Sequence, residues 1–339
     1  MGKTLEIARD RVLDQTKTVL PAEVARGVYV EHPPSAQALK LMHLLIATAG
    51  GRMADEVQHQ LRMADIKAVK GMRNHDRTTL RALFTQLRAA TLVWDDTEAQ
   101  CEIIGGFMDE IRIDYRHEVS DDLLVKWWFG RTFRQMAAES NHWAIIDRQT
   151  IFALSSKYSI LLFQHIASLV NFDHITSKTF SVQELRTILG IESGKIKRFA
   201  NLKKDVIDPA IAEINQLSRM SLTATPKKIG RTVASVEISW AVKADPTPAK
   251  RELAMSKIGR KARRDGETET LAVGFPTSGG IEFADHWKTI KREAGCNMDN
   301  TLISTKFRQW CASREPALRL DARNIDEMFS TFCRKVGAV

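Results

Sequence analysis

Apolar residues recur every three or four positions over the first part of the chain, which is the spacing of one helix face. Ser35 can cap the first such helix, and Gly50-Gly51 ends it. Its apolar positions are Leu39, Met42 and Ile46. A second helix is expected over about residues 54–69, and Asp76 can cap a third. The apolar positions of the third helix are Leu80, Leu83, Phe84 and Leu87.

After the third helix the apolar period changes to two, as in a half-buried strand. Residues 101–104 lead into Gly105-Gly106, and beyond them Ile111, Ile113 and Tyr115 alternate with charged residues. We therefore predict a β-hairpin whose turn lies at Gly105-Gly106.

The same order of elements then begins a second time. A long apolar stripe predicts one helix over 151–169. Ser181 and Glu184 have the spacing of a capping box, with Phe180 and Leu185 placed to pack across it. The short helix that they start is expected to stop at Gly190.

The third helix of this second set is expected from about Gly194, with Pro209 kinking or dividing it. Two strands, 222–225 and 233–240, then form a hairpin through the basic segment 226–231. Three helices followed by a two-stranded wing are typical of a winged-helix domain, and the chain shows this order twice.

We therefore predict a helix-rich α+β fold with tandem winged-helix domains and a small all-helical C-terminal module. Apolar stripes around Trp287, Phe307 and Phe329 indicate the three helices of that module. The predicted boundaries are an N-terminal arm at 1–30, a first winged-helix domain at 31–140, a second at 141–242, a basic linker at 243–280 and the helical module at 281–339.

Composition excludes several classes of protein. The 339 residues are 44% hydrophobic and 27% charged, which suits packed globular domains rather than a disordered or collagen-like chain. No apolar run approaches the ~18 residues of a membrane span, and the N-terminus lacks a secretory signal. The four cysteines are scattered, which predicts reduced thiols and a cytoplasmic protein.

The net charge of +9 favours a polyanionic partner, and its distribution is uneven. Residues 193–231 carry nine Lys or Arg against three acidic residues, and residues 241–265 carry eight against three. The second window includes the cluster 260–264, which could follow a DNA backbone, bind an acidic partner or serve as a charged spacer. We expect double-stranded DNA as the partner and no membrane.

The helix predicted after Gly194 combines an apolar face with a polar one. Lys197, Arg198, Asn201 and Lys204 project from the polar face. Arg can bind guanine with two hydrogen bonds, Asn can read adenine, and Lys can contact phosphate. An ordinary solvated helix face is the alternative, and the capped helix just before it favours a helix-turn-helix.

Other basic positions are weaker candidates. The wing tip offers Lys227, Lys228 and Arg231 to phosphate or to the minor groove, or it is simply a soluble basic turn. In the first repeat, the sparser basic surface of the third helix could bind DNA weakly or contact protein. It comprises Arg73, Arg77, Arg81 and Arg88.

Enzyme signals are absent from the sequence. The segment 190–196 lacks the spacing of a phosphate-binding loop, no histidine pair suits a metal-dependent nicking site, and Cys/His spacing for zinc is missing. We expect no catalytic residue, metal or cofactor.

Five segments together resemble the second winged helix of iteron-plasmid replication initiators, the Rep superfamily with two winged helices. These segments are 154–158 (LSSKY), 180–186 (FSVQELR), 202–210 (LKKDVIDPA), 213–215 (EIN) and 227–231 (KKIGR). The first repeat is similar in layout and weaker in sequence, and residues 281–336 look like a C-terminal extension found in some plasmid initiators.

The resemblance implies a protein that binds direct repeats at a plasmid origin, promotes opening of adjacent AT-rich DNA and recruits a host initiator and the replicative helicase. It implies monomers on the repeats, in equilibrium with a homodimer formed through the first winged helix. The resemblance implies that the bases are read by Lys195, Lys197, Arg198, Asn201 and Lys204. It implies that the wing contacts DNA through Lys227, Lys228 and Arg231. A winged-helix repressor at an inverted repeat, or a nucleic-acid enzyme such as a relaxase, are the alternatives.

Overall fold

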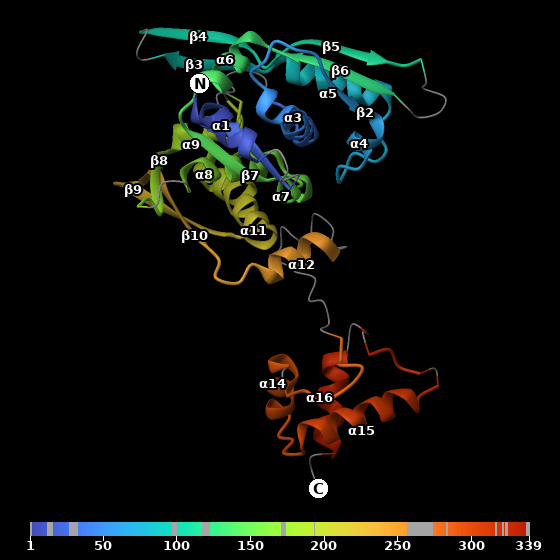
Figure 1. Ribbon diagram of the computed structural model, residues 1–339. Coiled ribbons are helices and arrows are strands. Elements are labelled where there is room, and N and C mark those ends of the chain that lie inside the picture. The colour runs from blue at the N-terminus through green and yellow to red at the C-terminus, as the bar shows by residue number, and fades with distance from the viewer. Residues whose placement is uncertain are drawn as a thin grey trace. The chain divides into compact units, whose positions relative to one another are not determined.

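The chain forms two compact units, Met1–Thr268 and Glu269–Val339, each with its own buried core. Figure 1 shows the course of the chain in the computed structural model. The structure describes residues 2–11, 16–26, 33–96, 100–116, 123–170, 174–192, 194–255, 274–282, 284–315, 317–320, 322 and 325–336.

The first repeat begins with helices and continues with antiparallel strands. Its elements are α1 (Lys3–Asp10), β1 (Lys17–Pro21), α2 (Ala22–Ala25), α3 (Ala36–Ala49), β2 (His59–Arg62), α4 (Met63–Lys67), α5 (Arg77–Ala89), β3 (Thr91–Asp96), β4 (Cys101–Gly106), β5 (Met108–Asp114) and β6 (Leu124–Phe129). Ser35 and Asp76 cap α3 and α5, as predicted, by accepting from the amides of Ala38 and Thr79. Residues 3–11 and 16–25, which belong to the predicted arm at 1–30, are folded into the unit, where β1 pairs with β7 (Trp143–Asp147).

The predicted hairpin with its turn at Gly105-Gly106 is wrong. Strand β4 pairs with β3, while β5 lies in a separate sheet of order β2-β6-β5. Both glycines lie within β4, and a side chain at position 105 would collide with Thr132 of α6 (Arg131–Glu139). Gly105 therefore permits close packing of β4 on α6, and sequence alone cannot distinguish that role from a turn.

The helix predicted over 54–69 is also wrong in its first half. Residues His59–Arg62 form strand β2, which pairs with β6, and the following helix α4 spans Met63–Lys67. His59 and Leu61 are buried on one face of the strand, and Gln60 and Arg62 are exposed on the other. Four residues are too few for the apolar period alone to separate a strand from a helix.

The second repeat continues from β7. Its further elements are α7 (Arg148–Ala153), α8 (Lys157–Leu169), β8 (Ser177–Ser181), α9 (Val182–Ile188), α10 (Phe199–Leu202), α11 (Asp208–Leu217), β9 (Met220–Ile229), β10 (Thr232–Val242) and α12 (Thr247–Met255). The single helix predicted over 151–169 is thus two helices. Ser156, in an extended conformation, interrupts the stripe and caps α8 by accepting from the amide of Tyr158.

One continuous core joins the two repeats. Helix α3 packs against both α5 and α8, and the buried side chains run without interruption from the N-terminal helix to Trp240 of β10. At the centre of this contact, His43 of α3 hydrogen-bonds to Gln164 of α8 at 3.2 Å. The repeats therefore form one folded unit rather than two separately linked domains.

Two regions beyond β10 differ in how well they were predicted. Thr247–Met255, expected to be linker, is helix α12, and it packs against α11 with Ala249 buried. The basic cluster 260–264 lies outside the described residues. In the second unit, the three predicted helices are present as α14 (Asp285–Glu293), α15 (Asn300–Ala312) and α16 (Ile325–Val336). They enclose an aromatic core of Phe275, Trp287, Phe307 and Phe329.

Burial lowers the pKa of three histidines, His43, His59 and His165, which predicts an acid-sensitive fold, and the largest shifts are those of His43 and His165. Burial lowers the pKa of His43 and of His165 to about 4 each, below the ~6.5 of an exposed histidine. Between these values the unfolded chain binds more protons than the folded one, so stability is lost as pH falls. Each of these two histidines should contribute a slope of about 1.4 kcal/mol per pH unit.

Urea unfolding at several pH values between 4 and 7 measures this slope. His43→Gln and His165→Gln should each flatten it, while His174→Gln, at an exposed turn, should leave it unchanged. An unaltered slope in both buried variants would contradict the assignment.

Candidate nucleic-acid interface

A single guanidinium group binds the segment between α9 and α10. Arg186, in the last turn of α9, donates to the carbonyl oxygens of Lys195 at 3.0 Å, of Lys197 at 3.1 Å, and of Ile196 between them. Ile196 has a φ of 49°, which is unfavourable for a β-branched residue. The converging hydrogen bonds hold the loop in this conformation. We call this arrangement the Arg186 clamp.

The predicted start of this helix, near Gly194, is wrong. Helix α10 begins at Phe199, not near Gly194, so that Lys195 and Lys197 lie in the loop before it and Arg198 is its N-cap residue. Of the predicted set, only Asn201 and Lys204 lie on helical turns. The helix continues through a π-helical turn, Lys203–Ile207, into α11.

Pro209 lies in the first turn of α11, directly after the π-helical turn. A proline has no amide N–H to donate to the preceding turn, and a π-helical turn accommodates the missing hydrogen bond. The helix therefore runs on past Pro209, so the reading face and the packed face belong to one continuous element.

This helical segment has one buried face and one exposed face, as predicted from the sequence. Leu202, Val206 and Ala210 are buried in the core. The candidate readers Lys195, Lys197, Arg198, Asn201 and Lys204 are all exposed. Their solvent-facing position leaves them available to a partner.

The charges on this face are not equally available. Glu192 lies 2.5 Å from the Lys195 ammonium, and this hydrogen-bonded ion pair raises the pKa of Lys195. In the described part of the chain, Lys197, Arg198 and Lys204 make no ion pair. Lys203 binds Asp208 at 2.6 Å and so neutralises one nearby acid. The surface thus offers three unpaired cations beside Asn201.

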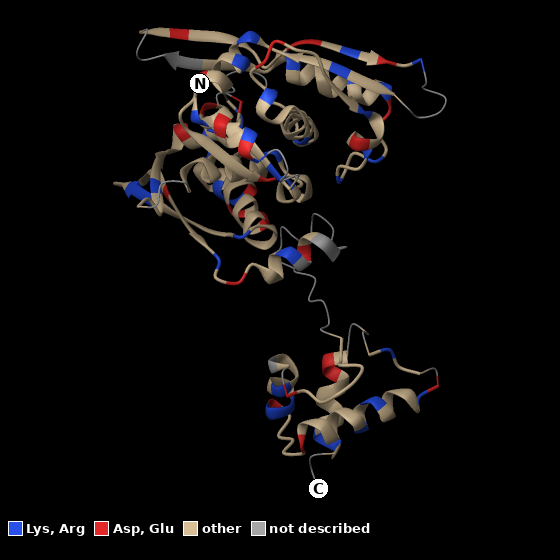
Figure 2. Cartoon of the chain, in the orientation of Figure 1, with Lys and Arg blue, Asp and Glu red and all other residues tan. Residues whose placement is uncertain are grey.

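The wing is a long hairpin that extends the sheet of order β8-β10-β9. Gly230, with a φ of 61°, makes the turn, and Figure 2 shows basic residues gathered on this hairpin. Lys227 is held by Glu237 at 3.3 Å and by the hydroxyl of Thr179 at 3.4 Å. Lys228 and Arg231, by contrast, are exposed and make no ion pair among the described residues.

The first repeat presents a more mixed surface. Arg73, Arg77 and Arg81 are exposed beside or on α5, as predicted. The guanidinium of Arg77 lies 4.5 Å from the ring centroid of Tyr115. Arg81 lines a groove together with Asp109 and Glu110 of β5, so acidic side chains offset its charge. This surface is electrostatically less suited to DNA than that of the second repeat.

The role of Arg186 was not predicted from the sequence. The carbonyl groups it binds lie nine to eleven residues further along the chain, beyond any helical periodicity. A basic residue in the last turn of a helix is ordinarily explained by the helix dipole. Among the described residues no cluster of metal-ligating side chains occurs, and no helix there is long and apolar enough to span a membrane.

Comparison with solved structures finds several similar chains, and two of them are described here. The first is the Pi initiator protein in complex with iteron DNA, at 20% identity and a TM-score of 0.49, covering 68% of this chain and 99% of that one. The second is domains 2 and 3 of RctB, at 10% identity and a TM-score of 0.37, covering 60% and 80%. A comparison with curated proteins finds no matching sequence.

Two family models match the chain directly. The WH1 model of initiator replication proteins matches residues 28–167, and the WH2 model of initiator Rep proteins matches residues 181–240. Together these matches cover more than half of the 339 residues. They confirm the two winged helices and the resemblance to plasmid replication initiators. The chain belongs to the initiator Rep protein family, DNA-binding proteins with two successive winged-helix domains.

Proposed function

We propose that this protein starts plasmid replication by binding direct repeats at the origin, with the second winged helix as the main reader. The family supports a DNA-binding initiator. The observation that carries the finer proposal is the Arg186 clamp. It presents Lys197 and Arg198 at the start of the reading helix, with the basic wing in the same domain.

The chemistry of each side chain determines whether it contacts a base or a phosphate in this proposal. Arg198 and Asn201 can hydrogen-bond base edges in the major groove, and Lys195, Lys197 and Lys204 supply phosphate contacts around them. The wing residues Lys227, Lys228 and Arg231 extend these contacts. The first winged helix, with Arg73, Arg77 and Arg81, makes auxiliary DNA contacts and forms a homodimer that exchanges with monomer.

Further steps of initiation complete the proposal. Bound protomers promote opening of AT-rich DNA next to the repeats and recruit a host initiator and the replicative helicase, in the cytoplasm. The proposed division of the chain is the one given by its sequence, with the first winged helix at 31–140 and the second at 141–242. No catalytic step is assigned to the protein.

Footprinting on the DNA that flanks the coding region tests the proposal. Protection should recur at direct repeats spaced by a multiple of ~10–11 bp, because each protomer then faces the same side of the duplex. One protected inverted repeat over a promoter would instead indicate a repressor. Uniform, steeply salt-dependent binding without a footprint would contradict both.

Arg198→Ala separates base reading from phosphate binding. At the protected site it should cost about 1–3 kcal/mol of binding free energy, with little loss on random duplex. Lys228→Ala is the matched control at the wing. It should weaken both duplexes equally and reduce the salt slope by about one. Equal losses on both duplexes for Arg198→Ala would assign that residue to phosphate alone.

Arg186→Lys tests the clamp. Lysine keeps the charge but cannot hold three carbonyl groups with a planar fork, so affinity for the protected site should fall at least tenfold. The salt slope should stay unchanged, since no phosphate contact is lost. Arg88→Lys, exposed on α5, is the control. An Arg186→Lys protein that binds like wild type would remove the clamp from the mechanism.

A further inference from the structure

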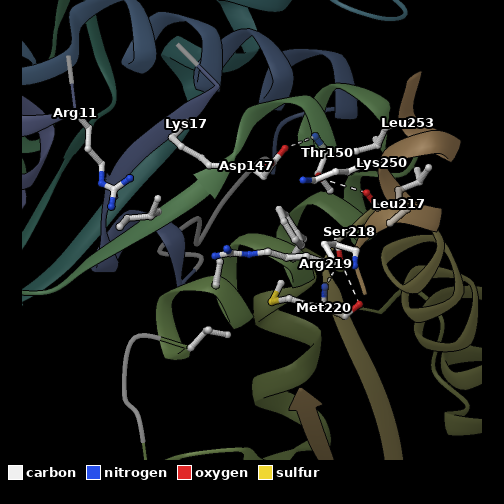
Figure 3. Close-up of a pocket in the computed structure, with 16 residues that line it drawn as sticks. Arg11, Lys17, Asp147, Thr150, Leu217, Ser218, Arg219, Met220, Lys250 and Leu253 are labelled. Carbon is white, nitrogen blue, oxygen red and sulfur yellow. Dashed lines mark hydrogen bonds and ion pairs between the residues drawn. The ribbon is translucent and has the colours of Figure 1, made fainter. Parts of the chain in front are cut away.

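A pocket at the end of the second repeat distant from the wing tip is not used by the proposed function. It has a volume of about 360 Å³ and lies between β1, β7, α8, the end of α11, the start of β9, and α12 (Figure 3). Strand β9 starts at this pocket with Met220 and ends nine residues later, at Ile229 beside the wing tip. At ~3.3 Å per residue the two sites are therefore about 30 Å apart.

The floor of the pocket is apolar. Phe163 and Ala167 of α8, Leu217 of α11 and Met220 of β9 are buried side chains that line it. Leu253 of α12 adds to this surface from the opposite wall. Such a lining favours the apolar body of a small molecule, and the volume lies at the lower end of known ligand sites.

The rim of the pocket is strongly basic. The four basic residues that line it come from separate segments of the chain: Arg11 after α1, Lys17 of β1, Arg219 between α11 and β9, and Lys250 of α12 (Figure 3). Asp147 is the single acidic residue in the lining, and it is already engaged by Lys17 at 2.6 Å and by the amide of Thr150 at 2.9 Å. Among the described residues, Arg219 and Lys250 make no ion pair.

From this combination we infer that the pocket binds a small amphipathic anion, that is, one carboxylate or phosphate on an apolar body. Arg219 and Lys250 would hold the anionic group, and the side chains of α8 and α11 would cover the body. The charged side chains of the lining sum to +3 and favour an anionic group, while the apolar floor favours the body attached to it.

Because α12 lines the pocket, a bound ligand would stabilise the position of this helix. Ala249, Lys250 and Leu253 of this helix form one wall of the pocket, while α8 and α11 form the other. A bound ligand would bridge α12 to the body of the first unit. Amide hydrogen exchange in α12 should therefore slow when the ligand is added.

The test uses the full-length protein and does not require DNA, so its result is independent of the proposed function. The fluorescent probe 8-anilino-1-naphthalenesulfonate should bind saturably with one site per chain. Decanoate should displace it at least tenfold better than decanol, which has the same apolar body without charge. Adenosine monophosphate is tested alongside, and displacement by it instead of decanoate would identify a nucleotide rather than a fatty acid as the source of the anion.

Paired variants locate the binding. Arg219→Ala with Lys250→Ala should weaken probe and decanoate binding at least tenfold, and Arg219→Lys with Lys250→Arg should restore it. Lys228→Ala with Arg231→Ala removes the same charge at the wing and should leave the binding of the probe and of decanoate unchanged. The inference fails if decanol competes equally, if neither anion displaces the probe, or if both alanine pairs lose binding to the same extent.

Discussion

The packing of α3 against α8 is the constraint on which the first unit depends. Ten residues of α3 and eleven of α8 are buried, so each helix is surrounded by protein on nearly every side. Each is the central helix of its own winged helix, and the two share one core. Lys40 of α3 is buried in this region, and its ammonium donates to the carbonyl oxygens of Phe152 at 2.6 Å and Lys70 at 3.2 Å. These carbonyls, from both repeats, replace the hydration that the cation loses on burial.

This shared core also supports the loop held by the Arg186 clamp. Gly190, which ends α9 with a φ of 58°, lies so close to Pro33 that a side chain would approach the proline ring to 2.8 Å. Pro33 leads directly into α3. The turn before the reading helix therefore rests on the segment that begins the first repeat. Movement of one winged helix relative to the other would disturb both the core and this turn, so we expect the two to approach DNA as a rigid pair.

The sequence predicted a structural feature correctly where the residues that determine it are close together in the chain. Caps at Ser35, Asp76 and Ser181 were correct because a cap involves only the next three residues. Two predictions were wrong because the cause was not local: the turn at Gly105-Gly106, and the start of the helix near Gly194. In each, a distant partner decides the local structure: Thr132 for the glycines and Arg186 for the helix start. The exposure of Asn201 and Lys204 was still predicted correctly, because the apolar face of the helix fixes it.

The distribution of charge separates the roles of the two units. Residues 269–339 carry ten Lys or Arg and nine Asp or Glu, so eight of the nine net positive charges belong to residues 1–268. Counterion release scales with the phosphates that a protein neutralises. We therefore expect most of the long-range electrostatic attraction to DNA to come from the first unit. The second unit, with its aromatic core and near-neutral surface, adds folded structure to the chain without adding appreciably to that attraction.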